Sequence, residues 1–329
     1  MSRVIGFTQY GGPDVLTYSD INVPAPSANE VRIQVKAIGL NRAESMWRNG
    51  AYVEPVNLPA RLGYESAGIV EAVGSNVTHV SVGDRVSTVP SFSLNDYGMY
   101  GELVLAPAHA VVKLPDSVSF EQGTAIWNVF ITPYGALIEN GLLKAGDFVL
   151  IPAASSAVGL GTIQIVKAAG GTPIATTRTS AKRDELLKAG AAYVIVTDEQ
   201  DMVAEVNNIT AGRGVNIVFE PVGGANFPQL IDALTPGGTL FIYGALAQEP
   251  TPLPLLSIIY KQPIIRGYNL FATTTDAARQ KAAVDFILKG LESGELKTQI
   301  AANFAFDDMI AAHRELEKNQ HLGKIVVTI

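Results

Sequence analysis

A turn of small residues near the middle of the sequence could bind a phosphate group. Residues 153–159, Ala-Ala-Ser-Ser-Ala-Val-Gly, follow a short apolar run at 148–151 and precede apolar residues at helical spacing. In a turn between a strand and a helix, backbone N–H groups and the helix N-terminus point at a bound phosphate. The turn is not a literal Gly-x-Gly-x-x-Gly, so alone it indicates a dinucleotide site only weakly.

A basic stretch follows the next apolar run and refines this interpretation. It contains Arg178, Ser180 and Lys182, where a dinucleotide fold usually has an acidic residue for the ribose 2′-hydroxyl of NAD. A carboxylate would repel a 2′-phosphate, whereas guanidinium, ammonium and hydroxyl groups bind it. The stretch therefore favours NADPH over NADH, the alternative being that these residues form a solvated first turn of a helix.

Both stretches belong to a repeated alternation of strands and helices. Apolar runs typical of buried strands alternate with amphipathic segments, and they lie at 148–151, 173–177, 193–197, 215–219 and 239–243. This alternation predicts a parallel sheet with right-handed crossovers and helices on both faces, which is a doubly wound dinucleotide-binding fold.

Three further loops follow predicted strands, at 221–224, 244–248 and 268–271. The carboxyl ends of parallel strands line the ligand crevice of such a sheet, so we expect these loops to approach the cofactor. Plain turn chemistry is the alternative for any one of them.

The rest of the chain has a different pattern. Residues 1 to about 120 contain short β-branched or alternating runs separated by Gly, Pro and Asn, which predicts a small, mostly-β domain. The last residues, 323–329, form a strand that we expect to return to that domain and close it. We therefore predict a discontinuous catalytic domain from 1–122 and 266–329 around a dinucleotide-binding domain at 123–265.

Composition excludes several classes of function. The 329 residues include 24 Lys and Arg against 31 Asp and Glu, and a net charge of −7 disfavours nucleic-acid binding. There is no cysteine, which excludes disulfides, thiol catalysis and Cys-containing zinc sites. The four scattered histidines show no ligand spacing, and we expect them to be surface or strand residues. No apolar run is long enough to span a membrane and no signal sequence is evident, so we expect a cytoplasmic protein.

Several motifs, in order along the chain, resemble the medium-chain dehydrogenase/reductase superfamily, and within it the zinc-free, zeta-crystallin-like quinone oxidoreductase branch. They are Asn41-Arg-Ala-Glu44, Gly63-Tyr-Glu-Ser-Ala-Gly-Ile-Val-Glu-Ala-Val-Gly74, Gly83-Asp-Arg-Val86, Ala153 to Gly159 and Gly323-Lys324. The resemblance implies a GroES-like domain, a Rossmann domain and a homodimer. Zinc enzymes of the superfamily have Cys and His where this chain has Asn41 and Tyr64, so a zinc-independent reaction is implied.

The loops and the resemblance together indicate the residues that contact NADPH. They are Asn41, Thr132, Ser155, Ser156, Ala157, Val158, Gly159, Thr177, Arg178, Ser180, Lys182, Gly223, Gly244, Ala245, Leu246, Ala247, Asn269, Leu270, Phe271 and Lys324. The branch usually has Gly-Gly where this chain has Ser156-Ala157, and serine hydroxyl groups could donate to the phosphate instead.

Without a metal, the substrate of hydride transfer must be activated by conjugation or by a hydrogen-bond donor, and a donor near the developing oxyanion lowers the barrier further. Tyr52 is the first candidate for the donor, with Asn41 orienting the ring or the substrate. We expect a substrate pocket formed by Tyr52, Tyr64, Phe92, Trp127 and Asn128, although each aromatic residue could instead be core packing.

These observations favour a zinc-independent, NADPH-dependent oxidoreductase that transfers hydride to a quinone or an α,β-unsaturated carbonyl. An enoyl-thioester reductase is one alternative, and an NADPH-binding structural or sensor protein with little turnover is another. The apolar run at 252–260 is either a homodimer interface or a buried segment.

Overall fold

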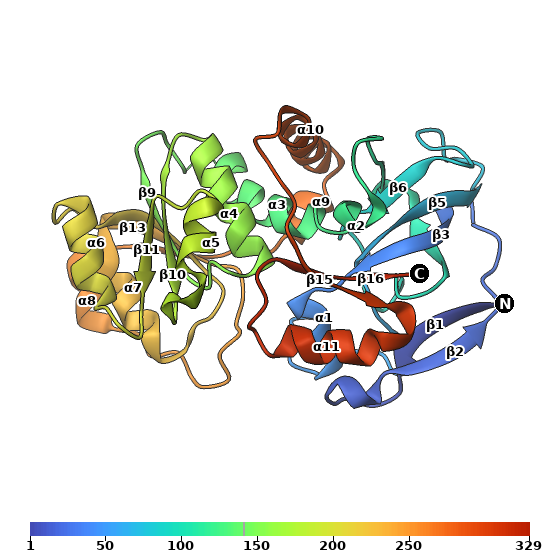
Figure 1. The fold of residues 1–329 in the computed structure, drawn as a ribbon, viewed down its shortest axis with the longest axis horizontal. Coiled ribbons are helices and arrows are strands. Elements are labelled where there is room, and N and C mark those ends of the chain that lie inside the picture. Colours follow the sequence, from blue (N-terminus) through green and yellow to red (C-terminus); the bar gives the residue numbers. More distant parts are fainter. Residues whose placement is uncertain (141) are drawn as a thin grey trace. The chain divides into compact units, whose positions relative to one another are not determined.

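The computed structural model of the chain describes residues 1–140 and 142–329 and divides into two compact units (Figure 1). The first unit comprises Met1–Asn128, Thr274–Gln280 and Thr298–Ile329, and the second comprises Val129–Thr273 and Lys281–Lys297. These boundaries differ from the predicted ones, because residues 123–128 belong to the first unit and residues 266–273 and 281–297 to the second.

The second unit contains the parallel sheet that the alternation predicts. Its strands are β9 (Phe148–Ile151), β10 (Thr172–Thr177), β11 (Tyr193–Val196), β12 (Val215–Glu220), β13 (Leu234–Ile242) and β14 (Ile264–Gly267). Every neighbouring pair in the order β11-β10-β9-β12-β13-β14 is parallel. The chain runs outward from β9 to β11 and returns to β12, so the strand order reverses between β9 and β12. The predicted doubly wound Rossmann fold is confirmed.

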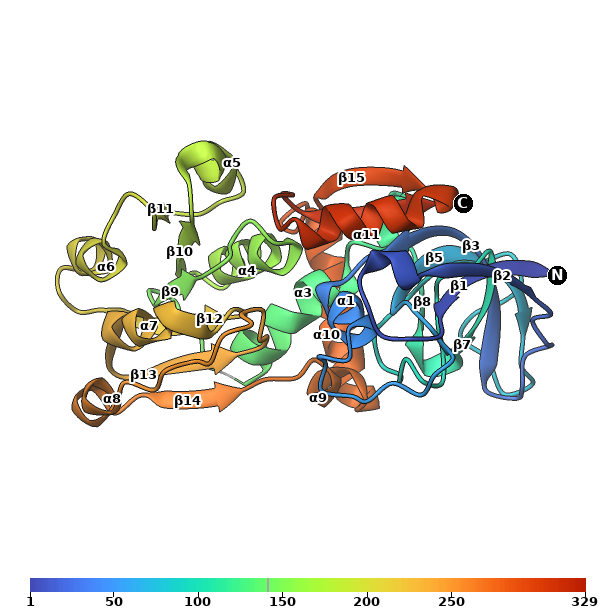
Figure 2. The same cartoon turned by 90° about the horizontal axis from the view of Figure 1, so that it is seen from below.

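Helices cover both faces of this sheet. They are α4 (Ala157–Ala168), α5 (Arg183–Lys188), α6 (Met202–Thr210), α7 (Phe227–Ala233) and α8 (Leu255–Lys261), with the π-helical η3 (Tyr134–Glu139) and the short η4 (Ser180–Lys182) and η5 (Gly224–Asn226). Figure 2 shows α4 on the opposite face of the sheet from α6, α7 and α8. Residues of both units form α3 (Trp127–Pro133), α9 (Phe271–Thr274) and α10 (Ala277–Ser293).

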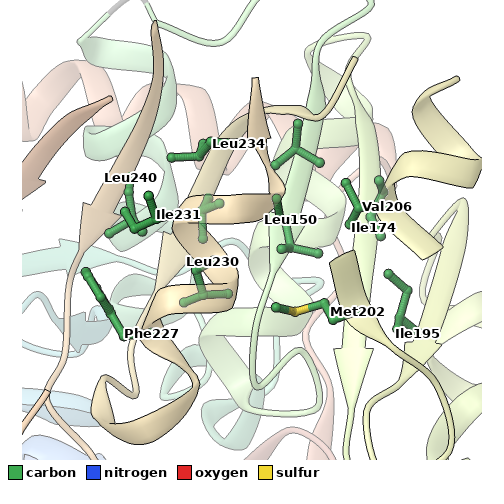
Figure 3. Packing of buried hydrophobic residues seen from close by; sticks show 13 residues of the cluster. Leu150, Ile174, Ile195, Met202, Val206, Phe227, Leu230, Ile231, Leu234 and Leu240 are labelled. Atoms are coloured by element: carbon green, nitrogen blue, oxygen red, sulfur yellow. The ribbon is translucent and has the colours of Figure 1, made fainter. Parts of the chain in front are cut away.

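One hydrophobic core lies between the sheet and the helices α6 and α7 (Figure 3). The strands contribute Leu150, Ile174, Ile195, Val215, Val218, Leu234 and Leu240, and the helices contribute Met202, Val206, Phe227, Leu230, Ile231 and Ala233. Each large side chain buried in this way contributes roughly 1.5–3 kcal/mol relative to exposure. This core fixes the ends of the strands, from which the loops of the candidate site extend.

The first unit is mostly β, as the sequence predicts for a GroES-like domain. Its strands are β1 (Ser2–Phe7), β2 (Thr17–Ile21), β3 (Glu30–Gly39), β4 (Ala60–Arg61), β5 (Glu65–Val73), β6 (Arg85–Thr88), β7 (Leu103–Pro107), β8 (Val111–Lys113), β15 (Ile300–Ala305) and β16 (Lys324–Thr328). A large sheet has the order β15-β16-β3-β5-β6-β8, with β7 on β3, and a small sheet has the order β2-β1-β4. The helices are α1 (Arg42–Arg48), α2 (Phe120–Gly123) and α11 (Met309–Glu317), with the short η1 (Pro13–Val15), η2 (Ala108–Ala110) and η6 (Phe306–Asp308).

The last strand closes the large sheet of this unit. β16 pairs antiparallel with β3, with Val326 opposite Gly39 and Val327 opposite Ile38. The expected return of the C-terminal strand to the first domain is therefore confirmed, and it brings the side chain of Lys324 into this unit.

The expectation for the histidines is wrong at His313. This residue lies in α11 and is fully buried, and its Nδ1 atom accepts a hydrogen bond from the buried Arg48 guanidinium group over 2.8 Å. Helical periodicity alone did not distinguish the buried face of α11 at this position from the solvated one.

The apolar run at 252–260 is not a buried segment. Within α8, Leu256, Ile259 and Tyr260 are 83%, 69% and 79% exposed, and all four residues of the neighbouring edge strand β14 are exposed. Of the two sequence-based interpretations, the buried segment is excluded and the interface stays a prediction.

Candidate active site

The N-terminus of α1 organises the candidate substrate residues of the first unit. Asn41 is the N-cap residue, and its backbone N–H donates to the Glu44 carboxylate over 2.8 Å. Glu44 is fully buried and also accepts from the Tyr64 backbone N–H (2.8 Å) and from the Tyr100 hydroxyl (2.5 Å). Burial raises the pKa of the Glu44 carboxyl group, although these donors and the charge of Lys324 oppose the shift. One carboxylate thus holds the segments that carry Asn41 and Tyr64.

The two tyrosines predicted for the substrate pocket are hydrogen-bonded to each other. The Tyr64 and Tyr52 hydroxyl groups lie beside each other, and either of them could be the donor. Burial raises the pKa of Tyr52 above its usual value of 10.0, and the charges of Glu54 and Glu44 raise it further. Tyr52 therefore stays protonated throughout the neutral range, as a proton donor must.

Hydrogen bonds between two loops hold the segment that carries Tyr52. The Glu54 carboxylate accepts hydrogen bonds from the Ser93 hydroxyl and from Asn95 Nδ2, the latter over 3.1 Å. Asn95 Nδ2 also donates to the Pro55 carbonyl over 2.9 Å. Because the 93–95 loop is bonded to residues 54 and 55, Tyr52 is placed by hydrogen bonds as well as by packing.

The structure separates the remaining predicted pocket residues by role. The Phe92 ring lies 5.8 Å from the Tyr64 ring, measured between centroids, so Phe92 belongs with the tyrosine pair. Trp127 is fully buried and its indole N–H donates to the Ser87 hydroxyl over 2.7 Å, which makes it a core residue. Asn128 Nδ2 donates to Asn41 Oδ1 over 2.5 Å, so its amide contacts the N-cap of α1.

In the second unit, the turn after β9 has the geometry of a phosphate-binding turn. The Ser156 hydroxyl caps α4 by accepting from the Gly159 backbone N–H over 3.0 Å. A Cβ atom at Gly159 would lie 2.7 Å from the Ala154 Cα atom, so only glycine allows this approach of helix to turn. The predicted roles of the serines therefore differ: Ser156 positions the helix, and Ser155 presents its hydroxyl to a lysine.

That lysine is Lys182, from the basic stretch that follows β10. Its Nζ atom lies 3.2 Å from the Ser155 hydroxyl oxygen, which joins the two stretches identified in the sequence. Burial lowers the pKa of Lys182, and the charge of the exposed Arg178 lowers it further. Lys182, beside a hydroxyl group and the N-terminus of α4, and the nearby Arg178 would both be stabilised by an anion.

The other predicted dinucleotide loops lie at the same edge of the sheet, because every strand is parallel. The loop after β13 rests on the loop after β12, since the Leu246 and Ala247 N–H groups donate to the Pro221 and Val222 carbonyl oxygens over 3.1 and 2.8 Å. After β14, Asn269 Oδ1 accepts from the Phe271 N–H over 3.0 Å. These hydrogen bonds hold residues 244–247 and 269–271 in place at this edge of the sheet.

Sequence reasoning missed Glu220 at the end of β12. Its carboxylate is buried and accepts from the Gly223 N–H over 2.6 Å, while Gly223 itself has a φ of 73° that favours glycine. Burial raises the pKa of Glu220. An acidic residue closing the apolar run 215–219 was the signal in the sequence, and its role is to shape the 221–224 loop.

No metal centre is evident in this site. Among residues 1–140 and 142–329, no group of three or more His, Cys, Asp or Glu side chains could hold a metal ion. Across the same residues, no helix has both the length and the apolar character that crossing a membrane requires.

Comparisons with known proteins agree with the architecture. The model of the alcohol dehydrogenase GroES-like domain matches residues 27–116, and that of the zinc-binding dehydrogenase family matches residues 157–289. A quinone oxidoreductase from Homo sapiens is 33% identical, over 96% of this chain and 94% of its own length.

Solved structures are similar along the whole chain. The quinone oxidoreductase of Pseudomonas syringae has a TM-score of 0.92 and 32% identity, with 100% of both chains covered. The quinone oxidoreductase of Escherichia coli, solved in complex with NADPH, has a TM-score of 0.91 and 31% identity, covering 99% of this chain and 100% of that one.

Proposed function

Since the chain belongs to the medium-chain dehydrogenase/reductase superfamily, in its quinone oxidoreductase branch, we propose that it is an NADPH-dependent quinone reductase. The observation that carries the proposal is the group formed by Ser155, Arg178 and Lys182 beside the N-terminus of α4. No carboxylate stands in this stretch to accept a 2′-hydroxyl bond, and two cations favour a phosphate there.

The residues present fit NADPH, which supplies a hydride when bound. Lys182 and Arg178 would hold the 2′-phosphate, and Ser155 would add a hydroxyl donor. The first turn of α4, which Gly159 allows to approach the turn closely, would direct its backbone N–H groups at the pyrophosphate. The loops at 244–247 and 269–271 would line the remaining part of the cofactor.

For the acceptor, we propose a quinone or another α,β-unsaturated carbonyl compound. Such molecules accept hydride because the negative charge that develops is delocalised onto oxygen. Tyr52, which burial keeps protonated and whose hydroxyl lies beside that of Tyr64, would hydrogen-bond to that oxygen and transfer its proton to it. Asn41 holds the N-terminus of α1, and the Tyr52 segment follows the other end of this helix.

We propose that the reaction needs no zinc. Asn41 and Tyr64, which replace the Cys and His of the zinc enzymes by resemblance, are engaged in the hydrogen bonds described above. Neither side chain is a usual zinc ligand, and the sequence has no cysteine.

Purified protein should oxidise NADPH in the presence of a quinone, followed at the absorbance of the reduced nicotinamide. Quinones, enones and enoyl-CoA thioesters would be compared, before and after exhaustive dialysis against a chelator. We expect quinones to be the preferred acceptors and the rate to survive dialysis. NADPH binding without oxidation by any acceptor would refute the enzymatic function, and activity restored only by added zinc would refute the metal-free mechanism.

We also propose that the chain forms a homodimer through β14 and α8. β14 is an exposed edge strand, and the neighbouring helix exposes Leu256 and Ile259. A second copy related by a twofold axis would pair the two edges and cover both apolar helices. Ile259→Glu should convert the dimer to a monomer in light scattering, whereas Leu187→Glu, at an exposed apolar residue of α5, should not. A wild-type monomer at micromolar concentration would refute the assignment.

The cytoplasm is the compartment that we propose. The chain contains no cysteine and therefore no disulfide that an oxidising compartment would form. Fractionation of the cells that express the protein would test this, and recovery outside the cytoplasmic fraction would contradict it.

A further inference from the structure

A closed ring of hydrogen bonds lies inside the first unit. The Lys324 ammonium donates to Glu65 Oε2 over 2.5 Å and to Asn41 Oδ1 over 2.6 Å. Asn128 completes the ring, since its backbone N–H donates to Glu65 Oε1 over 3.0 Å and its Nδ2 donates to Asn41 Oδ1 over 2.5 Å. Four residues from β16, β5, α3 and the N-cap of α1 thus share one network, of which Lys324, Glu65 and Asn41 are buried and Asn128 is half-buried.

The ammonium group of this ring lies in the interior. Lys324 is 2% exposed and Glu65 is fully buried, so neither charge is solvated by bulk water. Burying an ion is expensive unless a counterion and hydrogen bonds compensate it, and the two groups supply both for each other. The backbone N–H of Asn128 lies in the first turn of α3, where the helix dipole also stabilises the Glu65 carboxylate.

The cation determines which way the Asn41 amide faces. Its Oδ1 atom accepts from both Lys324 and Asn128, while its Nδ2 atom lies 3.2 Å from Glu44 Oε1. A flipped amide would place its NH2 group against two other donors and its oxygen against a carboxylate. The charge of Lys324 therefore excludes the flipped orientation.

From Asn41 the chain of contacts continues to the proposed proton donor. Glu44 binds both the backbone and the amide of Asn41 and also accepts from the Tyr64 backbone N–H. The Tyr64 hydroxyl in turn lies beside the Tyr52 hydroxyl. Lys324 is thus connected through the hydrogen bonds of Asn41 and Glu44 to Tyr64, whose side chain lies beside the group that would protonate the acceptor.

We propose that Lys324 is a positioning residue, an internal cation that orients Asn41 and Asn128 and neutralises Glu65, rather than a residue that binds NADPH. The inference rests on the proposed function, because the readout of positioning is the rate of hydride transfer. It corrects the role that the resemblance implies for Lys324, since its ammonium group is already bound to two partners inside the fold.

The test removes both charges of the ring together, so that no ion is left buried without its partner. The double variant Lys324→Met/Glu65→Gln would be compared with wild type in NADPH affinity, measured by the fluorescence of the bound nicotinamide, and in kcat at saturating NADPH and quinone. We expect kcat to fall about 10- to 100-fold, the effect of a displacement of about 1 Å, while the Kd for NADPH changes less than about threefold. Lys318→Met, at an exposed ion pair with Glu315, is the matched control and should leave both quantities unchanged.

Two outcomes would overturn the proposal. A Kd for NADPH raised tenfold or more with an unchanged kcat would make Lys324 a cofactor contact, and unchanged values of both would make the ring a purely structural ion pair. If the double variant does not fold, Lys324→Arg is measured instead. It keeps the charge but places it differently, so kcat should fall with an unchanged Kd, and an unchanged kcat would refute positioning.

Failure of the proposed function has a separate signature. A wild-type protein that binds NADPH but reduces no acceptor would refute the reductase function. The Kd for NADPH would then decide the role of Lys324, because a tenfold increase in the double variant would still identify a cofactor contact.

Discussion

Replacing the buried His313 should make the first unit less sensitive to acid. His313 Nδ1 accepts from Arg48, and its Nε2 atom has no hydrogen-bond partner among the described residues. Burial, assisted by the Arg48 charge, lowers the pKa of His313 from 6.5 to about 3. Protonation would require Nδ1 to become a donor facing a guanidinium group, so the folded state resists it.

The direction and the size of the change in stability follow from the difference in the His313 pKa between the folded and the unfolded chain. Between pH 6.5 and about 3 the unfolded chain binds a proton that the folded chain does not, so stability falls as the pH falls through this window. At pH 5 the ratio of protonated to neutral imidazole in the unfolded chain is about 30 to 1. This preference for the proton lowers the free energy of unfolding by about 2 kcal/mol. The full loss, near pH 3, is about 5 kcal/mol.

Urea unfolding of wild type and His313→Gln at pH 8 and pH 5 would measure this contribution. Glutamine can still accept from Arg48 but does not titrate. Tryptophan fluorescence reports the correct unit, because both tryptophans, Trp47 and Trp127, lie in the first one. Between pH 8 and pH 5, the free energy of unfolding should fall by about 2 kcal/mol more in wild type than in the variant. Equal losses would refute the buried, neutral state of His313.

Three further predictions concern the cofactor and the chemistry. Lys182→Ala should weaken NADPH binding about 10- to 100-fold through loss of a charge-assisted hydrogen bond of about 1.5–3 kcal/mol, with NADH affinity unchanged, and titration of both cofactors checks this. Tyr52→Phe should lower kcat by about 100-fold or more, and the wild-type rate should stay level from about pH 6 to 9 because burial raises the Tyr52 pKa; a variant as fast as wild type would refute the assigned role. Gly159→Ala should destabilise the second unit by about 1–3 kcal/mol and weaken NADPH binding, whereas Gly12→Ala, with open space around it, should do neither; calorimetry and titration distinguish them.

The sequence predicts the second unit well because its signals are local. Apolar runs such as 148–151 and 215–219 are strands buried on both faces, and the loops that follow them share one edge once the strands are parallel. The basic stretch could likewise be predicted, since a missing acid after a strand is visible without a structure.

The individual roles of the site residues depend on contacts between distant parts of the chain. Nothing around Ser155 and Ser156 indicates which hydroxyl caps α4 and which meets Lys182. Glu44 and Lys324 lie in motifs recognised from the sequence, but their burial depends on β16 and on Tyr100. A pattern of residue types does not specify which charged side chains become buried in the folded protein.

The pairing of β3 with β16 has a consequence for how the protein forms. Nearly the whole chain separates these neighbouring strands, so the large sheet cannot close until the last segment has been synthesised. The parallel sheet of the second unit, complete at residue 267, can assemble earlier on the ribosome. Glu65 and Asn41 can bind Lys324 only after β16 has been synthesised, so the proposed proton-donating group of the first unit should become competent later than the parallel sheet of the second unit.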